Sequence, residues 1–154
     1  ADEKRRCYVG YLQQAMTWRQ AQDWYDSLSK ATIWEQQPDT PRQTAWLVEA
    51  PCECAYGYGG QEVLPQRFPQ WMYDIMKHCM PLCGLEDWTT WPNSCNLNWY
   101  QDEWGSVGWH ADDERLFQGY YKDCLIISLS LGQTRCFDVK LWEADGDYDE
   151  DQFT

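Results

Sequence analysis

Histidine is the scarcest chemically versatile residue of this chain, with only two among 154 residues. His78 and His110 are therefore the only candidates for imidazole chemistry, either as a general base or as a metal ligand. Long hydrophobic runs are also missing. No apolar stretch approaches the roughly 20 residues that a helix needs to cross a bilayer, so we expect no membrane-spanning helix. Eight cysteines are present, but none forms a Cys-x-x-Cys pair, which argues against a zinc ribbon or knuckle.

Basic charge is scarce as well. Twelve Lys and Arg residues stand against 25 Asp and Glu, which gives a formal net charge of −13. An acidic surface repels phosphate and gains nothing from counterion release, so duplex DNA is a poor partner for this chain alone. The one basic cluster, Lys4-Arg5-Arg6, we interpret as a solvated N-terminal arm.

Aromatic residues are abundant, with 11 Trp and 10 Tyr. Most should lie in the core, because aromatic side chains bury a large area. So large an excess also indicates an interface with other protein subunits, where Trp and Tyr are enriched. The length predicts one domain. We place it at residues 1–141, followed by an acidic tail or loop at 142–154.

The order of helical and strand-like patterns predicts an α+β fold, with helices that flank a β-sandwich or jelly roll. The clearest predicted strand is 123–131, whose second half alternates apolar and hydroxyl side chains. The predicted helices are 8–29 and 70–80, the predicted strands are 44–48, 93–100, 123–131 and 136–141, and a glycine-rich hairpin is predicted at 56–60.

The cysteine spacing favours reduced thiols over a disulfide framework. Cys52 and Cys54 are too close in sequence for an easy mutual disulfide, and Cys79 and Cys83 are four residues apart on a predicted helix. Cys124 and Cys136 fall in predicted strands, where we interpret them as small core residues.

The tripeptide His110-Ala111-Asp112 is the strongest chemical signal. A His-x-Asp pair at the end of a strand would provide two of the three protein ligands of a non-haem Fe(II) oxygenase. Taken alone, the tripeptide is a weak signal and is more typical of an acidic surface turn. Its context comprises Asn98-Trp99-Tyr100, His110-Ala111-Asp112-Asp113-Glu114, Ser128-Leu129-Ser130-Leu131-Gly132 and Arg135-Cys136-Phe137, with Pro41-Arg42-Gln43-Thr44-Ala45-Trp46 and the Tyr56/Tyr58 hairpin upstream.

With this context, residues 30–141 resemble the AlkB family of Fe(II)- and 2-oxoglutarate-dependent dioxygenases, in particular the branch that repairs alkylated nucleic-acid bases. The resemblance implies a double-stranded β-helix (jelly roll) with flanking N-terminal helices, here lacking its last strands, and it implies Fe(II) and 2-oxoglutarate as cofactors. The implied roles are iron binding for His110 and Asp112, 2-oxoglutarate binding for Asn98 and Tyr100, and substrate binding for Arg42, Tyr56, Tyr58, Asp113 and Glu114. The alternatives are ordinary strand residues for Asn98 and Tyr100, and core or interface packing for Tyr56 and Tyr58.

The sequence departs from the family pattern after Asp112. The family pattern continues with a second iron-binding histidine and an Arg-x5-Arg run whose first arginine pairs with a 2-oxoglutarate carboxylate, and neither is present. His78 precedes the pair in a predicted helix and is not an easy substitute. The chain as given should therefore bind Fe(II) and 2-oxoglutarate poorly, and we expect it not to turn over.

Two hypotheses remain. The favoured one is an AlkB-like dioxygenase fold without a complete iron and 2-oxoglutarate site, which serves as a structural or interaction subunit of a larger assembly. The alternative is an active oxidative demethylase of alkylated nucleic-acid bases, of which this sequence is an incomplete stretch; nucleic acid is a partner only in that case. The start at Ala1 rather than Met leaves open a processed organellar protein, with the nucleus or cytoplasm as the alternatives.

Overall fold

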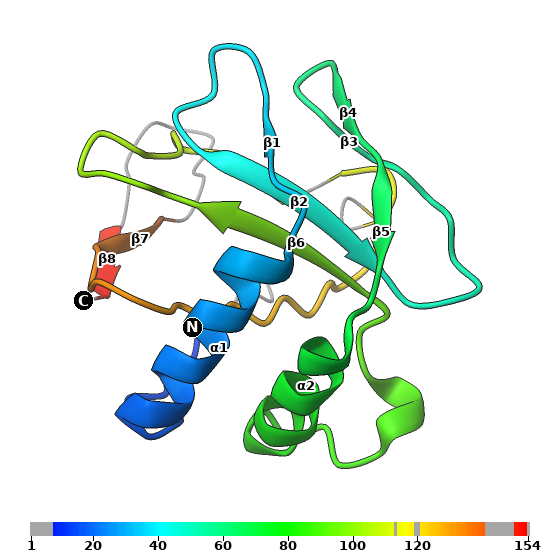
Figure 1. Ribbon diagram of the computed structural model, residues 1–154, viewed down its shortest axis with the longest axis vertical. Coiled ribbons are helices and arrows are strands. Elements are labelled where there is room, and N and C mark those ends of the chain that lie inside the picture. Colours follow the sequence, from blue (N-terminus) through cyan, green and yellow to red (C-terminus); the bar gives the residue numbers. More distant parts are fainter. Residues whose placement is uncertain (1–7, 113, 119–120, 141–149, 154) are drawn as a thin grey trace. The chain divides into compact units, whose positions relative to one another are not determined.

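The structure is a computed structural model that describes residues 8–112, 114–118, 121–140 and 150–153. Figure 1 traces the chain through its helices and strands. The chain divides into two compact units: residues 26–127 form one, and the segments up to Tyr25 and from Ser128 onward form the other. All described candidate site residues belong to the 26–127 unit.

The sheet of the 26–127 unit is built around β2 (Gln43–Val48). Strand β6 (Ser94–Trp99) pairs with it antiparallel over its whole length, with β2 and β6 side by side in Figure 1. The other edge of β2 pairs first with β1 (Glu35–Gln36), antiparallel, and then with β5 (Pro65–Arg67), parallel. The five residues from Thr44 to Val48 are all buried, as expected for a strand covered on both faces. The predicted strands at 44–48 and 93–100 are confirmed.

A tight hairpin of β3 (Tyr56–Tyr58) and β4 (Gln61–Val63) packs against β2. Gly59 and Gly60, the two turn residues, have φ angles of +57° and +78°. Glycine adopts such left-handed angles without the steric cost of a Cβ, and the resulting turn matches the twist of the two strands. The hairpin predicted at 56–60 is confirmed, and it joins β2 in one core cluster, which consists of Trp46, Val48, Tyr56 and Val63.

Helix α2 (Gln70–Leu82) follows β5 and buries one side, formed by Ile75, Met76, Cys79 and Met80. The helix ends at Leu82, and just beyond it Gly84, with a φ of +78°, turns the chain so that the Leu85 N–H donates to the Met80 carbonyl at 3.0 Å. This is the usual way in which a glycine satisfies the last carbonyls of a helix. The helix predicted at 70–80 is confirmed, and a 3-10 turn, η1 (Trp88–Thr90), leads on toward β6.

Helix α1 (Trp18–Ala31) begins ten residues later than the predicted helix at 8–29. The reason is a capping box at Thr17: the Gln20 N–H donates to the Thr17 hydroxyl at 3.3 Å, and the Thr17 N–H donates to the Gln20 side chain at 3.1 Å. Such a reciprocal pair satisfies two backbone donors at a helix start. The apolar spacing before Thr17 was therefore a misleading signal.

Strand β7 (Phe137–Lys140) pairs antiparallel with β8 (Glu150–Phe153) in the other unit. This confirms the strand predicted at 136–141 over residues 137–140. Residues 150–153, which we had assigned to an acidic tail or loop, form β8 instead. Residues 142–149 lie outside the described residues, so the boundary expected after residue 141 stays a prediction.

The strand predicted at 123–131, the clearest in the sequence, is wrong. Residues 123–131 have no regular secondary structure and pair with no strand among the described residues. Leu125 and Ile126 are 65% and 55% exposed, and Cys124 and Cys136 are exposed rather than core thiols. Alternation of side chains predicts a strand with one buried face, but a strand also needs a neighbour for its backbone hydrogen bonds.

The described elements thus confirm the α+β class. No described helix has the length and apolar character to cross a membrane.

Candidate functional site

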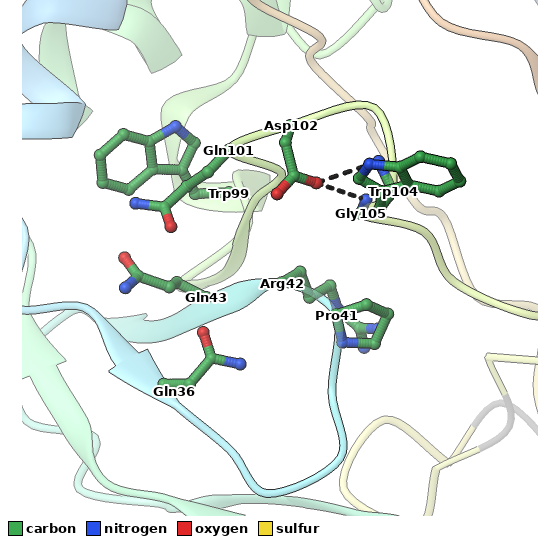
Figure 2. Close-up of a pocket in the computed structure, with 9 residues that line it drawn as sticks. All are labelled: Gln36, Pro41, Arg42, Gln43, Trp99, Gln101, Asp102, Trp104 and Gly105. Atoms are coloured by element: carbon green, nitrogen blue, oxygen red, sulfur yellow. Dashed lines mark hydrogen bonds between the residues drawn. The ribbon is translucent and has the colours of Figure 1, made fainter.

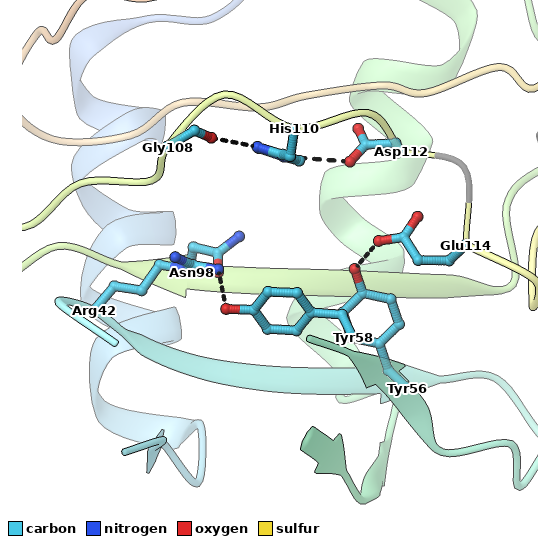
Figure 3. Close-up of polar contacts among 8 residues, drawn as sticks. All are labelled: Arg42, Tyr56, Tyr58, Asn98, Gly108, His110, Asp112 and Glu114. Carbon is cyan, nitrogen blue, oxygen red and sulfur yellow. Dashed lines mark hydrogen bonds and ion pairs between the residues drawn. The ribbon is translucent and has the colours of Figure 1, made fainter. Parts of the chain in front are cut away.

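The two candidate iron ligands lie on one loop. His110 and Asp112 belong to a stretch without regular structure after Gly105, not to the end of a strand as the motif had suggested. The structure nevertheless brings their side chains together: His110 Nε2 lies 3.4 Å from Asp112 Oδ1. Both side chains are about half exposed, at 52% and 45%. Figure 3 shows them facing each other across the loop.

The His110 ring is oriented by the backbone. Its Nδ1 lies 2.7 Å from the Gly108 carbonyl oxygen. Because a carbonyl oxygen only accepts, Nδ1 is the donor in this contact, and Nε2 is the ring nitrogen that faces Asp112. Metal-binding histidines are typically fixed in this way, with one ring nitrogen donating to a carbonyl and the other facing the metal.

This pair fits two positions of a metal site. Two ligand atoms that each lie about 2.1 Å from a metal, at right angles, are about 3 Å apart, close to the observed separation. A third protein ligand is not supplied within residues 8–112, 114–118, 121–140 and 150–153, where no group of three or more His, Cys, Asp and Glu side chains could hold a metal ion. His78 lies in α2, as predicted.

A polar cluster forms around Arg42, at the start of β2. The Arg42 side chain is buried, with Nε donating to Asn98 Oδ1 and Nη2 donating to the Tyr58 hydroxyl, both at 2.8 Å. Sequence reasoning had separated these residues into a 2-oxoglutarate contact and two substrate contacts. The structure joins them because the register of β2 with β6 sets Asn98 opposite Thr44, beside Arg42, and the hairpin carries Tyr58 to the same place.

Tyr56 and Glu114 form a second pair, in which the Tyr56 hydroxyl donates to Glu114 Oε1 at 2.5 Å. Burial, followed by the Glu114 carboxylate, raises the pKa of the Tyr56 hydroxyl well above its usual value, so this group stays a neutral donor. The ring of Tyr56 stacks on Trp46 at 5.0 Å and lies 6.0 Å from Phe117. This geometry favours the packing interpretation of Tyr56 over base stacking.

Glu114 keeps one acceptor unused. Its Oε2 is buried and has no hydrogen-bond partner among the described residues. A buried carboxylate oxygen without a donor is costly, so such an atom is a candidate contact for a bound ligand. Of the other predicted site residues, Tyr100 is half-buried directly after β6, and Asp113 lies outside the described residues.

Sequence reasoning missed a pocket of about 210 Å³ next to Arg42. Figure 2 shows its lining, which consists of Gln36, Pro41, Arg42, Gln43, Trp99, Gln101, Asp102, Trp104 and Gly105. The Asp102 carboxylate shapes one wall by accepting from the Trp104 and Gly105 N–H groups, each at 3.0 Å. Gly105 is required there, because a Cβ would lie 2.9 Å from the Pro41 carbonyl oxygen. The sequence signal that could have indicated a turn at this wall is the short spacing of Asp102 and Gly105, two residue types that favour turns.

Comparison with known proteins gives a family. The family model described as the 2OG-Fe(II) oxygenase superfamily matches residues 8–153. The chain is 33% identical over 140 residues to the alpha-ketoglutarate-dependent dioxygenase alkB homolog 3 of Mus musculus, which covers 82% of this chain and 44% of that protein. It is 35% identical over 112 residues to the protein of the same name from Rattus norvegicus, with 70% and 34% covered. The chain thus spans less than half the length of these relatives.

Proposed function

Because the chain belongs to the 2OG-Fe(II) oxygenase superfamily, we propose that it carries part of the active site of an AlkB-type dioxygenase. In this proposal, His110 and Asp112 are two of the three iron ligands. The third ligand and the arginine that anchors 2-oxoglutarate come from outside the described residues. The jelly roll that the family implies is part of the same proposal.

The observation that carries the proposal is the orientation of His110. Its Nδ1 contact with the Gly108 carbonyl directs Nε2 toward Asp112 Oδ1, which is 3.4 Å away. A solvated surface turn would not require a histidine fixed by the backbone in this way. Fe(II) and 2-oxoglutarate, when bound, would activate dioxygen, the oxidant that none of the side chains of this chain can replace.

The residues around the pair have distinct roles in this proposal. Arg42 holds Asn98 and Tyr58 in place, so that the face of the sheet near the iron ligands keeps a fixed polar surface. Glu114 is fixed by Tyr56 through one oxygen and can accept a hydrogen bond from substrate with the other. The pocket beside Arg42, with three Gln amides and two Trp rings, offers groups suited to a planar polar substrate.

For the substrate we propose an alkylated nucleic-acid base that has left its stack. The net charge of −13 disfavours contact with phosphates, so affinity would have to come from the base. An enzyme that modifies a base must in any case take it out of the duplex or act on a single strand.

The first experiment measures metal binding by the 154-residue chain, with Co(II) as a spectroscopic probe. We expect weak binding that is lost in His110→Ala and in Asp112→Asn but retained in His78→Ala, the matched control. Binding that survives His110→Ala, or that depends on His78, would overturn the assignment of the ligands.

A second experiment measures succinate release from 2-oxoglutarate with added Fe(II). We expect little turnover from this chain and robust turnover from a longer protein that contains it, with loss of turnover in His110→Ala. Robust succinate production by the 154-residue chain would refute the expectation that its site is incomplete.

An interaction subunit is the second candidate function. It is favoured by residues 124–131, which pair with no strand among the described residues and in which the apolar side chains of Leu125 and Ile126 are exposed. Such a segment is suited to pair with a neighbouring strand. If the longer protein releases no succinate yet co-purifies at fixed stoichiometry with another chain, this function replaces the first.

A further inference from the structure

The loop between β2 and β3 holds two thiols close together. A turn in which the Cys52 N–H donates to the Glu49 carbonyl at 3.0 Å brings the chain back toward the sheet. Cys52 is half-buried and packs against the core cluster of Trp46, Val48, Tyr56 and Val63, whereas Cys54 is exposed. The seven described cysteines are all free thiols.

The two cysteines are in hydrogen-bond contact. The Cys54 N–H donates to Cys52 Sγ at 3.5 Å, and the Cys54 side chain also acts on the Cys52 thiol by lowering its pKa. A positive charge lies nearby: the Arg67 guanidinium donates to the Cys52 carbonyl and pairs with Glu53 Oε1 at 2.8 Å.

These neighbours make the two thiols unequal. The Cys54 N–H, the Cys54 thiol and the charge of Arg67 lower the pKa of the Cys52 thiol, although some burial and Glu53 act against them. Cys54 itself has a raised pKa, mainly because it donates to Cys52. A thiol of lowered pKa, which ionises more readily, next to a second thiol that can form a disulfide with it is the arrangement found in redox-sensing cysteine pairs.

We propose that Cys52 and Cys54 form a reversible oxidation site, in which Cys52 reacts with hydrogen peroxide and Cys54 resolves the product as a disulfide. This modification site is independent of the proposed dioxygenase function.

The chemistry balances in two steps. The Cys52 thiolate attacks one oxygen of hydrogen peroxide, the O–O bond breaks, and the products are Cys52 sulfenic acid and hydroxide. The Cys54 thiol then gives up its proton and attacks the Cys52 sulfur as a thiolate, forming the S–S bond and breaking the S–O bond, and the expelled oxygen takes up that proton and leaves as water. In total the two thiols lose two electrons and one peroxide becomes two waters.

The close spacing that disfavours a structural disulfide here favours a reversible one. A ring closed across one intervening residue is strained, and strained exposed disulfides are the readily reduced, regulatory kind. Closing the ring must also move Cys54, whose carbonyl accepts from Trp46 Nε1 at 2.7 Å. Oxidation should therefore disturb the contact between this loop and the core cluster that supports the hairpin.

A single tryptic peptide reports on the oxidation of both thiols. Cleavage after Arg42 and Arg67 gives the peptide 43–67, which contains Cys52 and Cys54 and no other cysteine. The protein is treated with limiting hydrogen peroxide, alkylated with iodoacetamide and digested, and the peptide masses are measured by mass spectrometry. We expect this peptide to become two hydrogens lighter and resistant to alkylation before Cys83 is oxidised, and a dithiol reductant should restore both thiols.

Variants assign the two roles. In Cys54→Ser, dimedone should trap sulfenic acid at Cys52, and in Cys52→Ser the remaining Cys54 should react about tenfold more slowly. Arg67→Gln should slow oxidation of Cys52 several-fold, while Cys83→Ser, which removes an exposed thiol elsewhere, should change nothing. Oxidation at equal rates at Cys52 and Cys83 in the unmodified protein, or no dimedone adduct in Cys54→Ser, would overturn the proposal.

Discussion

The Arg42 cluster makes the sharpest prediction, because the stability cost of removing the Tyr58 hydroxyl should depend on whether the Arg42 guanidinium is present. Arg42 is 9% exposed and donates to Tyr58 and Asn98 at 2.8 Å. Tyr58→Phe leaves a guanidinium N–H without its acceptor while the charge stays buried. Hydrogen bonds to charged groups contribute about 1.5–3 kcal/mol, and because Tyr58 is half-exposed, water can replace part of that. We expect Tyr58→Phe to lower the free energy of unfolding by about 1.5 kcal/mol.

The same change should cost almost nothing once the charge is gone. Arg42→Met keeps much of the packing of the side-chain stem but removes the buried guanidinium, so Tyr58 no longer accepts a hydrogen bond from a charged group. In the Arg42→Met background, Tyr58→Phe should then change stability by less than about 0.5 kcal/mol. The coupling energy of the double-mutant cycle should be about 1 kcal/mol or more.

Urea denaturation followed by Trp fluorescence and by circular dichroism measures all four proteins. The two signals must coincide, and the urea dependence must be shared, before the free energies are compared. Equal cost of Tyr58→Phe in both backgrounds would refute the reasoning, because it would mean that Tyr58 stabilises the fold without Arg42.

Other predictions concern the core, the hairpin and the thiols. Trp46→Phe should destabilise the fold by about 1–2 kcal/mol, measured by urea denaturation, because it removes the donor to the Cys54 carbonyl and leaves a void; an unchanged midpoint would contradict this. Gly60→Ala should cost about 1 kcal/mol in the same assay because of its φ of +78°, and a gain in stability would argue against this turn. Cys79 should react with iodoacetamide far more slowly than Cys83 at pH 8, because burial raises the pKa of the Cys79 thiol and leaves less thiolate; equal rates would show that α2 opens readily.

Sequence patterns predicted the elements whose backbone hydrogen bonds are local or whose ends are marked by glycine or proline. The hairpin at 56–60 followed from its glycines, and α2 followed from its apolar spacing between prolines and Gly84. The start of α1 could also have been found, since Thr17 and Gln20 are the two residues of a capping box. These features depend on residues that are only a few positions apart, so the sequence shows them directly.

Sequence patterns failed where the outcome depends on a distant partner. The segment 123–131 has a clear alternation, but the alternation does not say whether a neighbouring strand is there to pair with it. The Arg42 cluster was missed as a cluster for the same reason, since Arg42, Tyr58 and Asn98 meet only through strand register. For the candidate ligands, the spacing of His110 and Asp112 identified the pair, whereas the Gly108 contact that orients the ring needed coordinates.

The central position of β2 also sets the order in which this protein can fold during synthesis. Its full-length partner is β6, and the register joins Gln43 to Trp99 and Val48 to Ser94. Contacts between residues about 50 apart close a long loop and form late. A ribosome that has released only the first half of the chain therefore exposes β2 with β6 still to come, although β2 is apolar and buried along most of its length. Until residue 99 has emerged, this strand lacks its full-length partner and is open to non-native contacts.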